Sequence, residues 1–232
     1  MTAEELLKQT SGLGPVEALT FIALQFPGEV IFSSSFGWED QVISHIIFSN
    51  NLPIKVFTLE TGRLFPETYY VWNRTLEKYN KPIYAYYPNH DLVEAMVSAK
   101  GPSSFYESVE NRKECCAIRK VEPLKRALKG NKCWITGIRA DQSANRDHMH
   151  HVEWDENNQI IKFHPIFEWD LEKVKEYINE YNIPYNPLHD KGFPSIGCAP
   201  CTRAVQAGED FRAGRWWWED QDKKECGLHS AS

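Results

Sequence analysis

The sequence has no long hydrophobic run. Its longest uninterrupted apolar stretch, residues 83–87, is five residues long, whereas a membrane-spanning helix needs about 20. The N-terminus, residues 1–8, is acidic and amphipathic. It therefore lacks the basic start and the apolar stretch of a signal peptide. We expect a cytoplasmic protein with no membrane-spanning segment.

The chain also has fewer basic than acidic residues. The chain has 26 Lys and Arg against 32 Asp and Glu, which gives a formal net charge of -6 at pH 7. Proteins that coat nucleic acids usually carry a basic excess, because they must neutralise phosphates. We therefore expect no nucleic-acid partner. A small anionic ligand is still allowed, since it needs only a few local Lys and Arg.

Apolar residues are plentiful enough for a core. Hydrophobic residues make up 42% of the 232 residues and aromatic residues 13%, which excludes a disordered chain. The length favours one large domain. From residue 208 onward the chain is charged and rich in tryptophan. We therefore predict an α/β domain over residues 1–207, followed by a functional tail over residues 208–232.

Short apolar runs alternate with helix-like segments over the first 140 residues. The runs predict buried strands at residues 30–33, 55–59, 83–86 and 132–136. The periodic segments predict helices at residues 39–50, 66–79 and 114–128. This alternation is typical of a parallel sheet with helices on both faces. Residues 151–163 predict a hairpin at the sheet edge, and residues 170–181 a further helix.

Four of the six cysteines form two pairs. Cys198 and Cys201 make a C-x-x-C pair, and Cys115 and Cys116 are adjacent. Four thiolates can hold zinc or an iron–sulfur cluster. Adjacent cysteines have diverging side chains, which strains a site for one small ion but suits the separate iron atoms of a cubane. The pattern therefore favours a cluster over zinc.

The other two cysteines have different surroundings. Cys226 lies in the polar tail near Lys224 and His229, which favour its thiolate. It is the candidate nucleophile, although an exposed thiol without a role fits the same position. Cys133 lies within an apolar run, where free cysteine usually acts as a buried hydrophobe.

Small residues follow two of the predicted strands. The first strand leads through Ser33, Ser34 and Ser35 to Gly37, just before a helix. Such a turn presents backbone N–H groups and a helix dipole to an anion. The second strand leads from Leu59 through residues 60–63. Open α/β sheets bind ligands at the carboxyl ends of their strands, so we expect the two loops to lie side by side around an anionic ligand.

Motifs spread over nearly the whole chain resemble those of the phosphoadenylyl-sulfate reductase family, and within it the assimilatory adenylyl-sulfate reductases. The early motifs are residues 34–40 and residues 60–68. The later ones are Cys115-Cys116 with Arg119-Lys120, residues 136–143, residues 198–203, residues 212–219 and residues 225–229. Two positions depart from the family pattern: Glu60 replaces the usual Asp, and Trp38 replaces a small residue.

The resemblance implies an adenine nucleotide α-hydrolase-like fold with a mobile C-terminal tail. It implies reduction of adenosine 5'-phosphosulfate to sulfite and AMP in sulfate assimilation, with thioredoxin or a glutaredoxin as the reductant. Cys226 would attack the sulfonate sulfur and carry it as an S-sulfocysteine. One 4Fe-4S cluster would be held by Cys115, Cys116, Cys198 and Cys201. A homo-oligomer is compatible with the sequence.

The resemblance also implies the residues that bind the substrate. Positive charge for the phosphosulfate would come from Lys120, Arg212, Arg215 and Arg139. The nucleotide loops would contribute Ser33, Ser34, Ser35, Gly37, Leu59, Gly62 and Gly137. Glu60 and Trp38 lie in or beside these loops, so the two departures affect the nucleotide contact and the rim of its pocket.

Three other functions remain open from the sequence. The first is the same reaction on the 3'-phosphorylated nucleotide, although relatives for that substrate generally lack the two cysteine pairs. The second is a cluster-bearing sulfur transferase that acts on RNA, which the acidic charge balance disfavours. The third is a redox sensor without enzymatic activity, which would leave Cys226 and the arginines without a role.

Overall fold

The computed structural model describes residues 1–142 and 149–219. They form two compact units, which are described separately. The first unit contains residues 1–58, 70–84 and 128–186, and the second contains residues 59–69, 85–127 and those from 187 onward. No helix among the described residues has both the length and the apolar character needed to cross a membrane. The predicted tail lies partly outside these residues, so its separation at residue 208 stays a prediction.

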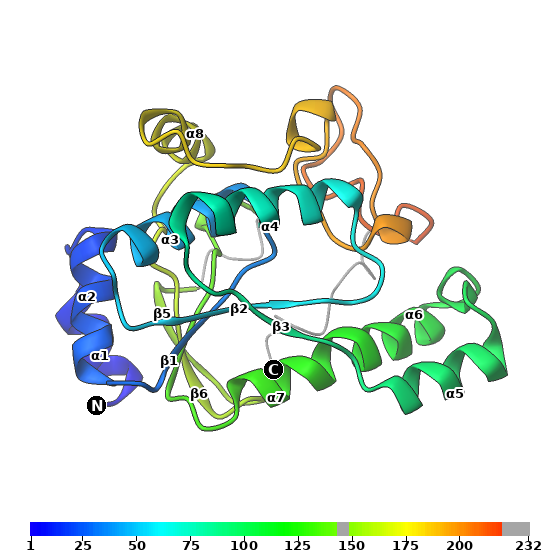
Figure 1. Ribbon diagram of the computed structural model, residues 1–232, viewed down its shortest axis with the longest axis horizontal. Helices are drawn as coiled ribbons and strands as arrows, with labels where there is room; N and C mark the ends of the chain where they lie inside the picture. Colours follow the sequence, from blue (N-terminus) through cyan, green and yellow to red (C-terminus); the bar gives the residue numbers. More distant parts are fainter. Residues whose placement is uncertain (143–148, 220–232) are drawn as a thin grey trace. The chain divides into compact units, whose positions relative to one another are not determined.

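The strands form one mixed sheet, with the order β3-β2-β1-β4-β6-β5 (Figure 1). β1 is parallel to both β2 and β4, β4 is parallel to β6, and only β5 runs antiparallel, beside β6. The strands are β1 Val30–Ser33, β2 Lys55–Leu59, β3 Tyr84–Tyr86, β4 Cys133–Ile135, β5 Val152–Asp155 and β6 Ile160–Phe163. The predicted parallel sheet and its edge hairpin are therefore confirmed.

The helices of the first unit begin where the sequence supplies capping groups. α1 (Ala3–Thr10) has a capping box, in which the Glu5 N–H donates to Thr2 Oγ1 at 3.2 Å and the Thr2 N–H donates to Glu5 Oε2 at 2.8 Å. α8 (Leu171–Glu180) is capped by Asp170. The other helices are α2 Pro15–Gln25, α3 Trp38–Ser49 and α4 Pro66–Tyr79. Of these, α3, α4 and α8 match the helices predicted at residues 39–50, 66–79 and 170–181 within one residue.

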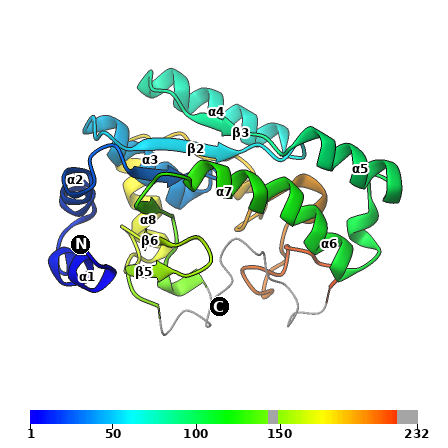
Figure 2. The ribbon, with the colours of Figure 1, turned by 90° about the horizontal axis from the view of Figure 1, so that it is seen from below.

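The core of the first unit lies between the sheet and these helices. α3 packs against α2 and α8, and α1 packs against β5 (Figures 1 and 2). Cys133 is fully buried in this core, and burial raises the pKa of its thiol well above the usual range. Trp38 is half-buried and packs on the same core. Cys133 is therefore a structural hydrophobe, as expected.

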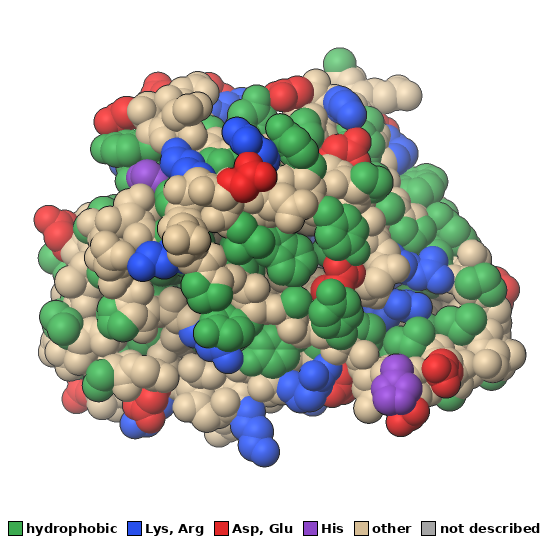
Figure 3. All heavy atoms as spheres, in the orientation of Figure 1, with side chains coloured by type: hydrophobic (Ala, Val, Ile, Leu, Met, Phe, Trp, Pro, Cys, Tyr) green, Lys and Arg blue, Asp and Glu red, His purple; other side chains and the backbone are tan. Residues whose placement is uncertain are grey.

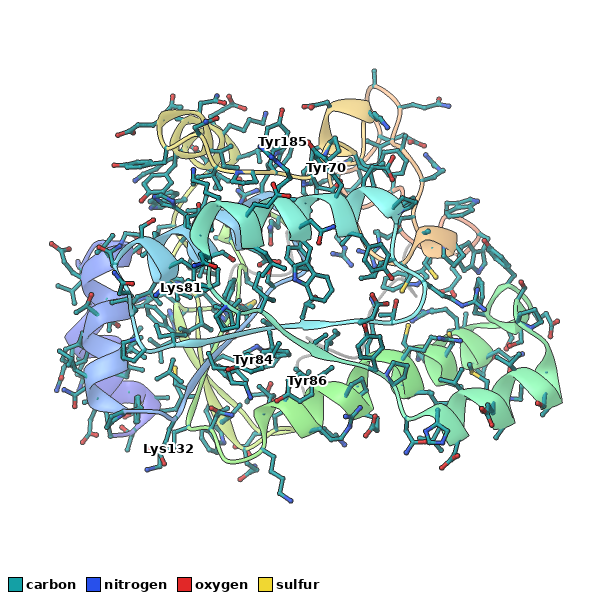
Figure 4. The ribbon with its side chains drawn as sticks, viewed as in Figure 1. Tyr70, Lys81, Tyr84, Tyr86, Lys132 and Tyr185 are labelled. Atoms are coloured by element: carbon teal, nitrogen blue, oxygen red, sulfur yellow. The ribbon has the colours of Figure 1, made fainter. Side chains whose placement is uncertain are left out.

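The edge strand β3 exposes aromatic rings. Tyr84 and Tyr86, which are labelled in Figure 4, lie on this strand. The Tyr84 side chain is 48% exposed, and Lys55 Nζ lies 4.6 Å from the centre of its ring. A charged neighbour of this kind is one way in which proteins protect an open strand edge. On the face drawn in Figure 3, basic and acidic side chains are interspersed.

Helices dominate the second unit, and here the sequence prediction was partly wrong. A single helix was expected over residues 114–128. Instead α6 (Val109–Cys116) starts earlier, capped by Ser108, and is separated from α7 (Glu122–Leu128) by the π-helical turn Ala117–Val121. α5 (His90–Lys100) was not predicted at all. Short 3-10 turns at Ser104–Tyr106, His189–Lys191 and Ala199–Cys201 complete the unit.

Candidate functional site

In the first unit, the serine-rich loop after β1 is held by an aspartate. Both the backbone N–H and the Oγ of Ser35 donate to Asp40 Oδ2, each at 2.6 Å. The Phe36 N–H donates to Ser34 Oγ at 3.2 Å, and Phe36 has a left-handed backbone with φ 62°. Such a conformation is uncommon for a non-glycine residue and costs free energy. The loop therefore has a defined shape where it enters α3.

Asp40 also explains why residue 137 is glycine. A Cβ atom at Gly137 would lie 2.3 Å from Asp40 Oδ1, which is too close for any side chain. Asp40 is buried, and this burial raises the pKa of its carboxyl to about 7, although the hydrogen bonds from Ser35 act in the opposite direction. Ser35, Asp40 and Gly137 therefore come together at the carboxyl ends of β1 and β4.

The buried Asp40 carboxyl should make stability depend on pH. Its pKa is higher in the folded protein than in the unfolded chain, so the folded state binds the extra proton and loses stability as the pH rises from about 4 to above 7. A shift of about 3 pKa units corresponds to about 4 kcal/mol. We expect Asp40→Asn to remove most of this pH-dependent loss, measured by urea unfolding between pH 4 and pH 8.

The exposed Asp91 offers a matched control. Asp91→Asn should follow the wild-type curve. If the difference in unfolding free energy between wild type and Asp40→Asn were the same at pH 4.5 and pH 8, Asp40 would not titrate in this range.

Arg139 lies in the same unit but is committed to other groups. Its side chain is only 1% exposed, its Nε donates to Glu39 Oε1 at 2.8 Å, and its Nη1 donates to Asp141. Gln142 Nε2 donates to the same Glu39 oxygen at 2.9 Å. The charge of Arg139 is therefore balanced by two carboxylates. Its predicted contact with the phosphosulfate stays a prediction.

The second unit brings both cysteine pairs to one pocket. Its lining consists of cysteines, basic residues and a few others: Arg63, Phe105, Arg112, Cys115, Cys116, Arg119, Lys120, Cys198, Pro200, Cys201, Arg215 and Trp216. We call it the thiol pocket. The spacing of the cysteines predicts that the four act together, and all four line this pocket. Of the predicted substrate-binding residues, Lys120 and Arg215 line this pocket, whereas Arg212 does not.

Local structure fixes the four thiols. Cys115 and Cys116 end α6, and the π-helical turn that follows carries Arg119 and Lys120. π turns occur often at functional sites. The C-x-x-C pair is held by the 3-10 turn Ala199–Cys201, in which the Cys201 N–H donates to the Cys198 carbonyl at 2.9 Å. The backbone of Arg63 anchors this turn, because its carbonyl accepts the Ala199 N–H at 2.8 Å.

Burial favours the protonated form of two of the thiols, Cys115 and Cys201. It raises the pKa of Cys115, and it raises the pKa of Cys201 to about 12, with Cys198 raising both further. Basic neighbours oppose these shifts: Arg119 at Cys115 and Lys120 at Cys201. Metal ions bind the thiolate, so binding here must release protons. Metal affinity should therefore increase with pH.

The donors that line the pocket suit an anionic, sulfur-rich group. Among the described residues, three buried N–H groups of the lining have no hydrogen-bond partner, and they are Arg119 Nε, Arg215 Nε and Trp216 Nε1. Buried donors without acceptors cost free energy. A 4Fe-4S cluster with four thiolates carries negative charge and exposes sulfur acceptors, so this lining fits it. The described residues contain no group of three or more His, Cys, Asp or Glu arranged to hold a single metal ion.

Arg215 is held rigidly beside the C-x-x-C pair. It is buried, its Nη1 donates to Ser195 Oγ at 3.3 Å, and its guanidinium lies 4.9 Å from the centre of the Trp216 ring. A Cβ atom at Gly197 would lie 2.3 Å from its Nη2. A glycine is therefore needed at residue 197 for this arginine to reach the pocket.

The predicted loop residues Leu59 and Gly62 lie in the second unit. Gly62 has φ 72°, a conformation that favours glycine, and its N–H donates to Glu60 Oε1 at 2.6 Å. Glu60 is buried. The longer side chain of Glu60, compared with the usual Asp, therefore folds back on its own loop. Whether Leu59 and Gly62 contact the nucleotide stays a prediction.

Two residues that line the thiol pocket, Arg63 and Arg112, and one that contacts a pocket thiol, Thr61, were not singled out from the sequence. Thr61 Oγ1 accepts a hydrogen bond from Cys198 Sγ at 3.3 Å, Arg63 lies over the Phe105 ring, and Arg112 lines the pocket beside Trp216. Thr61 and Arg63 do lie in a motif that was noted. Arg112 precedes the cysteines by one helical turn, which is the only signal that could have pointed to it. The candidate nucleophile Cys226 lies outside the described residues.

Comparison with known proteins identifies relatives over almost the whole chain. Residues 29–204 match the family model of the phosphoadenosine phosphosulfate reductase domain. Adenosine 5'-phosphosulfate reductase of Agrobacterium fabrum is 48% identical over 221 residues, covering 95% of this chain and 85% of its own length. The enzyme of the same name from Sinorhizobium fredii strain NGR234 is 46% identical, covering 99% of this chain and 91% of its own length.

Solved structures of other proteins share the fold of this chain. The crystal structure of a phosphoadenylyl-sulfate reductase from Candida auris, in complex with phosphate, superposes with a TM-score of 0.75 at 30% identity. The match covers 88% of this chain and 96% of that protein. FMN adenylyltransferase of Candida glabrata superposes with a TM-score of 0.55 at 16% identity. At that identity the likeness concerns the fold alone, and it supports the predicted adenine nucleotide α-hydrolase-like architecture.

Proposed function

The chain belongs to the phosphoadenosine phosphosulfate reductase family, and from this we propose that it reduces adenosine 5'-phosphosulfate to sulfite and AMP in sulfate assimilation and cysteine biosynthesis. The observation that carries the proposal is the identity of 46 to 48% with enzymes named for this reaction, over nearly the full chain. The thiol pocket supports it, because a pocket lined by four cysteines and five basic residues suits chemistry on an anionic substrate.

The proposed reaction proceeds in three displacements. The Cys226 thiolate attacks the sulfonate sulfur, the bond from sulfur to the phosphate oxygen breaks, and AMP leaves with that electron pair. A thiol of reduced thioredoxin, or of a glutaredoxin, then attacks Cys226 Sγ, and sulfite departs with the electron pair of the broken S–S bond, which leaves a mixed disulfide. A second thiol of the reductant attacks its own sulfur in this mixed disulfide, so that Cys226 leaves as a thiolate and the reductant ends as a disulfide. The dithiol thus supplies both electrons, and a cytoplasmic location would keep it reduced.

Basic residues of the second unit would assist the first displacement. Lys120 and Arg215 line the thiol pocket and can offset the charge on the departing phosphate. Arg212 would add a third charge from the segment before Arg215. The 4Fe-4S cluster, held by Cys115, Cys116, Cys198 and Cys201, would supply fixed charge and a rigid link between the two cysteine elements. Lys120 and Arg215 flank that position, so they would be held next to it.

Removing one of these charges should weaken substrate capture. A charge-assisted hydrogen bond is typically worth about 1.5 to 3 kcal/mol, or roughly ten- to hundredfold in a rate or binding constant. We expect Arg215→Ala and Lys120→Ala to lower kcat/KM by that factor in a thioredoxin-coupled sulfite assay. Arg126→Ala is the matched control, because Arg126 is an exposed cation paired with Glu122. Unchanged kinetics in Arg215→Ala would show that it does not serve the substrate.

A second candidate substrate is the 3'-phosphorylated nucleotide. The Candida auris structure, at 30% identity, is named for that substrate. This chain is more similar to enzymes named for the nucleotide without the 3'-phosphate, so adenosine 5'-phosphosulfate is the favoured substrate. Sulfite release from each nucleotide, measured with the same thioredoxin, distinguishes the two. A higher kcat/KM for adenosine 5'-phosphosulfate is expected, and the reverse order would assign the chain to the other reaction.

A further inference from the structure

A buried ion pair in the second unit joins α6 to Glu219, in the part of the predicted tail that the structure describes, residues 208–219. We call this part the base of the tail. Arg112 Nε donates to Glu219 Oε1 at 2.9 Å, and Arg112 Nη2 donates to Glu219 Oε2 at 2.7 Å. The two side chains are 1% and 4% exposed. The Arg112 guanidinium also lies 4.7 Å from the centre of the Trp216 ring. The pair is thus bidentate, stacked on an aromatic ring and shielded from water.

Both members of this pair lie close in sequence to residues that are proposed to take part in the reaction. Arg112 precedes Cys115 by three residues on α6, and Glu219 follows Arg215 by four and precedes Cys226 by seven. A single contact therefore connects the helix that carries two pocket thiols with the last described residue before the nucleophile. Buried bidentate pairs of this kind have one preferred geometry, so the contact fixes the point from which the tail departs.

The backbone supports the same attachment. The Trp216 N–H donates to the Cys201 carbonyl at 3.1 Å, and the Glu219 N–H donates to the Trp216 carbonyl at 2.9 Å. Trp217 and Trp218 pack against Tyr106, whose hydroxyl donates to the Pro200 carbonyl at 2.7 Å. The segment is therefore held to the C-x-x-C turn at one end and to α6 at the other. Glu219 provides the attachment nearest to Cys226.

We propose that Arg112 and Glu219 form a positioning pair, which fixes the base of the tail on α6 and so restricts where Cys226 can search for the sulfonate. Cys226 follows Glu219 by seven residues, a separation that spans at most about 25 Å when extended. A tether anchored close to the site keeps the local concentration of the thiol high, whereas a loosened base lets the thiol sample unproductive positions. This inference rests on the proposed function.

The test separates the delivery of Cys226 from folding and from substrate binding. Glu219→Gln and Glu219→Ala are assayed under anaerobic conditions, with adenosine 5'-phosphosulfate and no reductant, in single-turnover experiments in which mass spectrometry follows SO3 addition to Cys226. We expect the addition to be roughly tenfold slower in Glu219→Ala, in line with the cost of misplacing a reacting group. Iron content, visible absorption, nucleotide affinity and the rate of Cys226 alkylation by iodoacetamide should stay as in wild type.

Glu209 offers a matched control in the same segment. It forms a similar two-contact pair with Arg203, but that pair is partly exposed, at 32% and 35%, and its residues do not line the thiol pocket. Glu209→Ala should react at the wild-type rate.

The outcomes separate this inference from the proposed function. If wild-type protein acquires no SO3 group, the proposed function fails. If wild type reacts and Glu219→Ala reacts equally fast, the positioning role fails while the function stands. If Glu219→Ala loses iron or nucleotide affinity, the pair maintains the pocket and does not position the tail, which also overturns the inference. Glu219→Gln, which keeps the size of the side chain, guards against a loss caused by packing alone.

Discussion

Cys226→Ser protein is expected to bind adenosine 5'-phosphosulfate and to release no sulfite. The serine hydroxyl is a poor nucleophile at neutral pH, and loss of a covalent nucleophile typically costs at least about a thousandfold in kcat. The assay is sulfite formation with thioredoxin, beside nucleotide binding measured by calorimetry. Among the cysteines, Cys226 is suited to this role because it is separate in sequence from both cysteine pairs and lies among charged residues. If one of the four pocket thiols reacted with the substrate, it could no longer bind the cluster.

Mass spectrometry makes this prediction specific. Wild-type protein given substrate without reductant should carry one SO3 group on the peptide that contains Cys226, and Cys226→Ser should carry none. Ser230→Ala, four residues along the same tail, is the matched control and should react normally. An adduct on the buried Cys133, or turnover by Cys226→Ser with thioredoxin, would contradict the mechanism.

The sequence predicted secondary structure correctly where it depends on neighbouring residues. Residues 66–79 were predicted as a helix, and α4 has those bounds. The edge hairpin was also predicted correctly, since it depends on neighbouring residues. Local signals failed between residues 87 and 113, where α5 has no strong apolar periodicity. They failed again at residues 117–121, because a π turn has no sequence pattern of its own.

Long-range pairing explains what the sequence could not predict at the site. The predicted contact of Arg139 with the substrate stays a prediction, but the pairing of this arginine within the protein could not be read from the sequence. The structure shows that Glu39, 100 residues earlier in the chain, already accepts from it. In the same way, the partner of Arg112 is 107 residues away. The cysteine pairs were grouped correctly because thiols are rare in this chain, whereas charged residues are too common for their partners to be guessed.

Replacing a single cysteine of the thiol pocket is expected to abolish binding of the cluster. Anaerobically purified wild-type protein should contain four iron atoms and four sulfides per chain, with broad visible absorption. Cys198→Ser and Cys201→Ser should lose both the iron and the absorption, because each removes one of four thiolate ligands. Cys133→Ala, a change at a cysteine of the other unit, should keep its iron even if it is less stable.

Loss of the cluster should also destabilise the protein. Without it, the buried donors Arg119 Nε, Arg215 Nε and Trp216 Nε1 have no acceptor among the described residues, and each such group costs at least about 1 kcal/mol. A loss of about 3 kcal/mol corresponds to a Tm lower by roughly 6 to 12 °C for a chain of this size. Thermal unfolding of Cys201→Ser against wild type, both prepared anaerobically, measures it. One equivalent of zinc in place of iron would contradict the cluster, and an unchanged Tm after loss of iron would show that these donors do not depend on it.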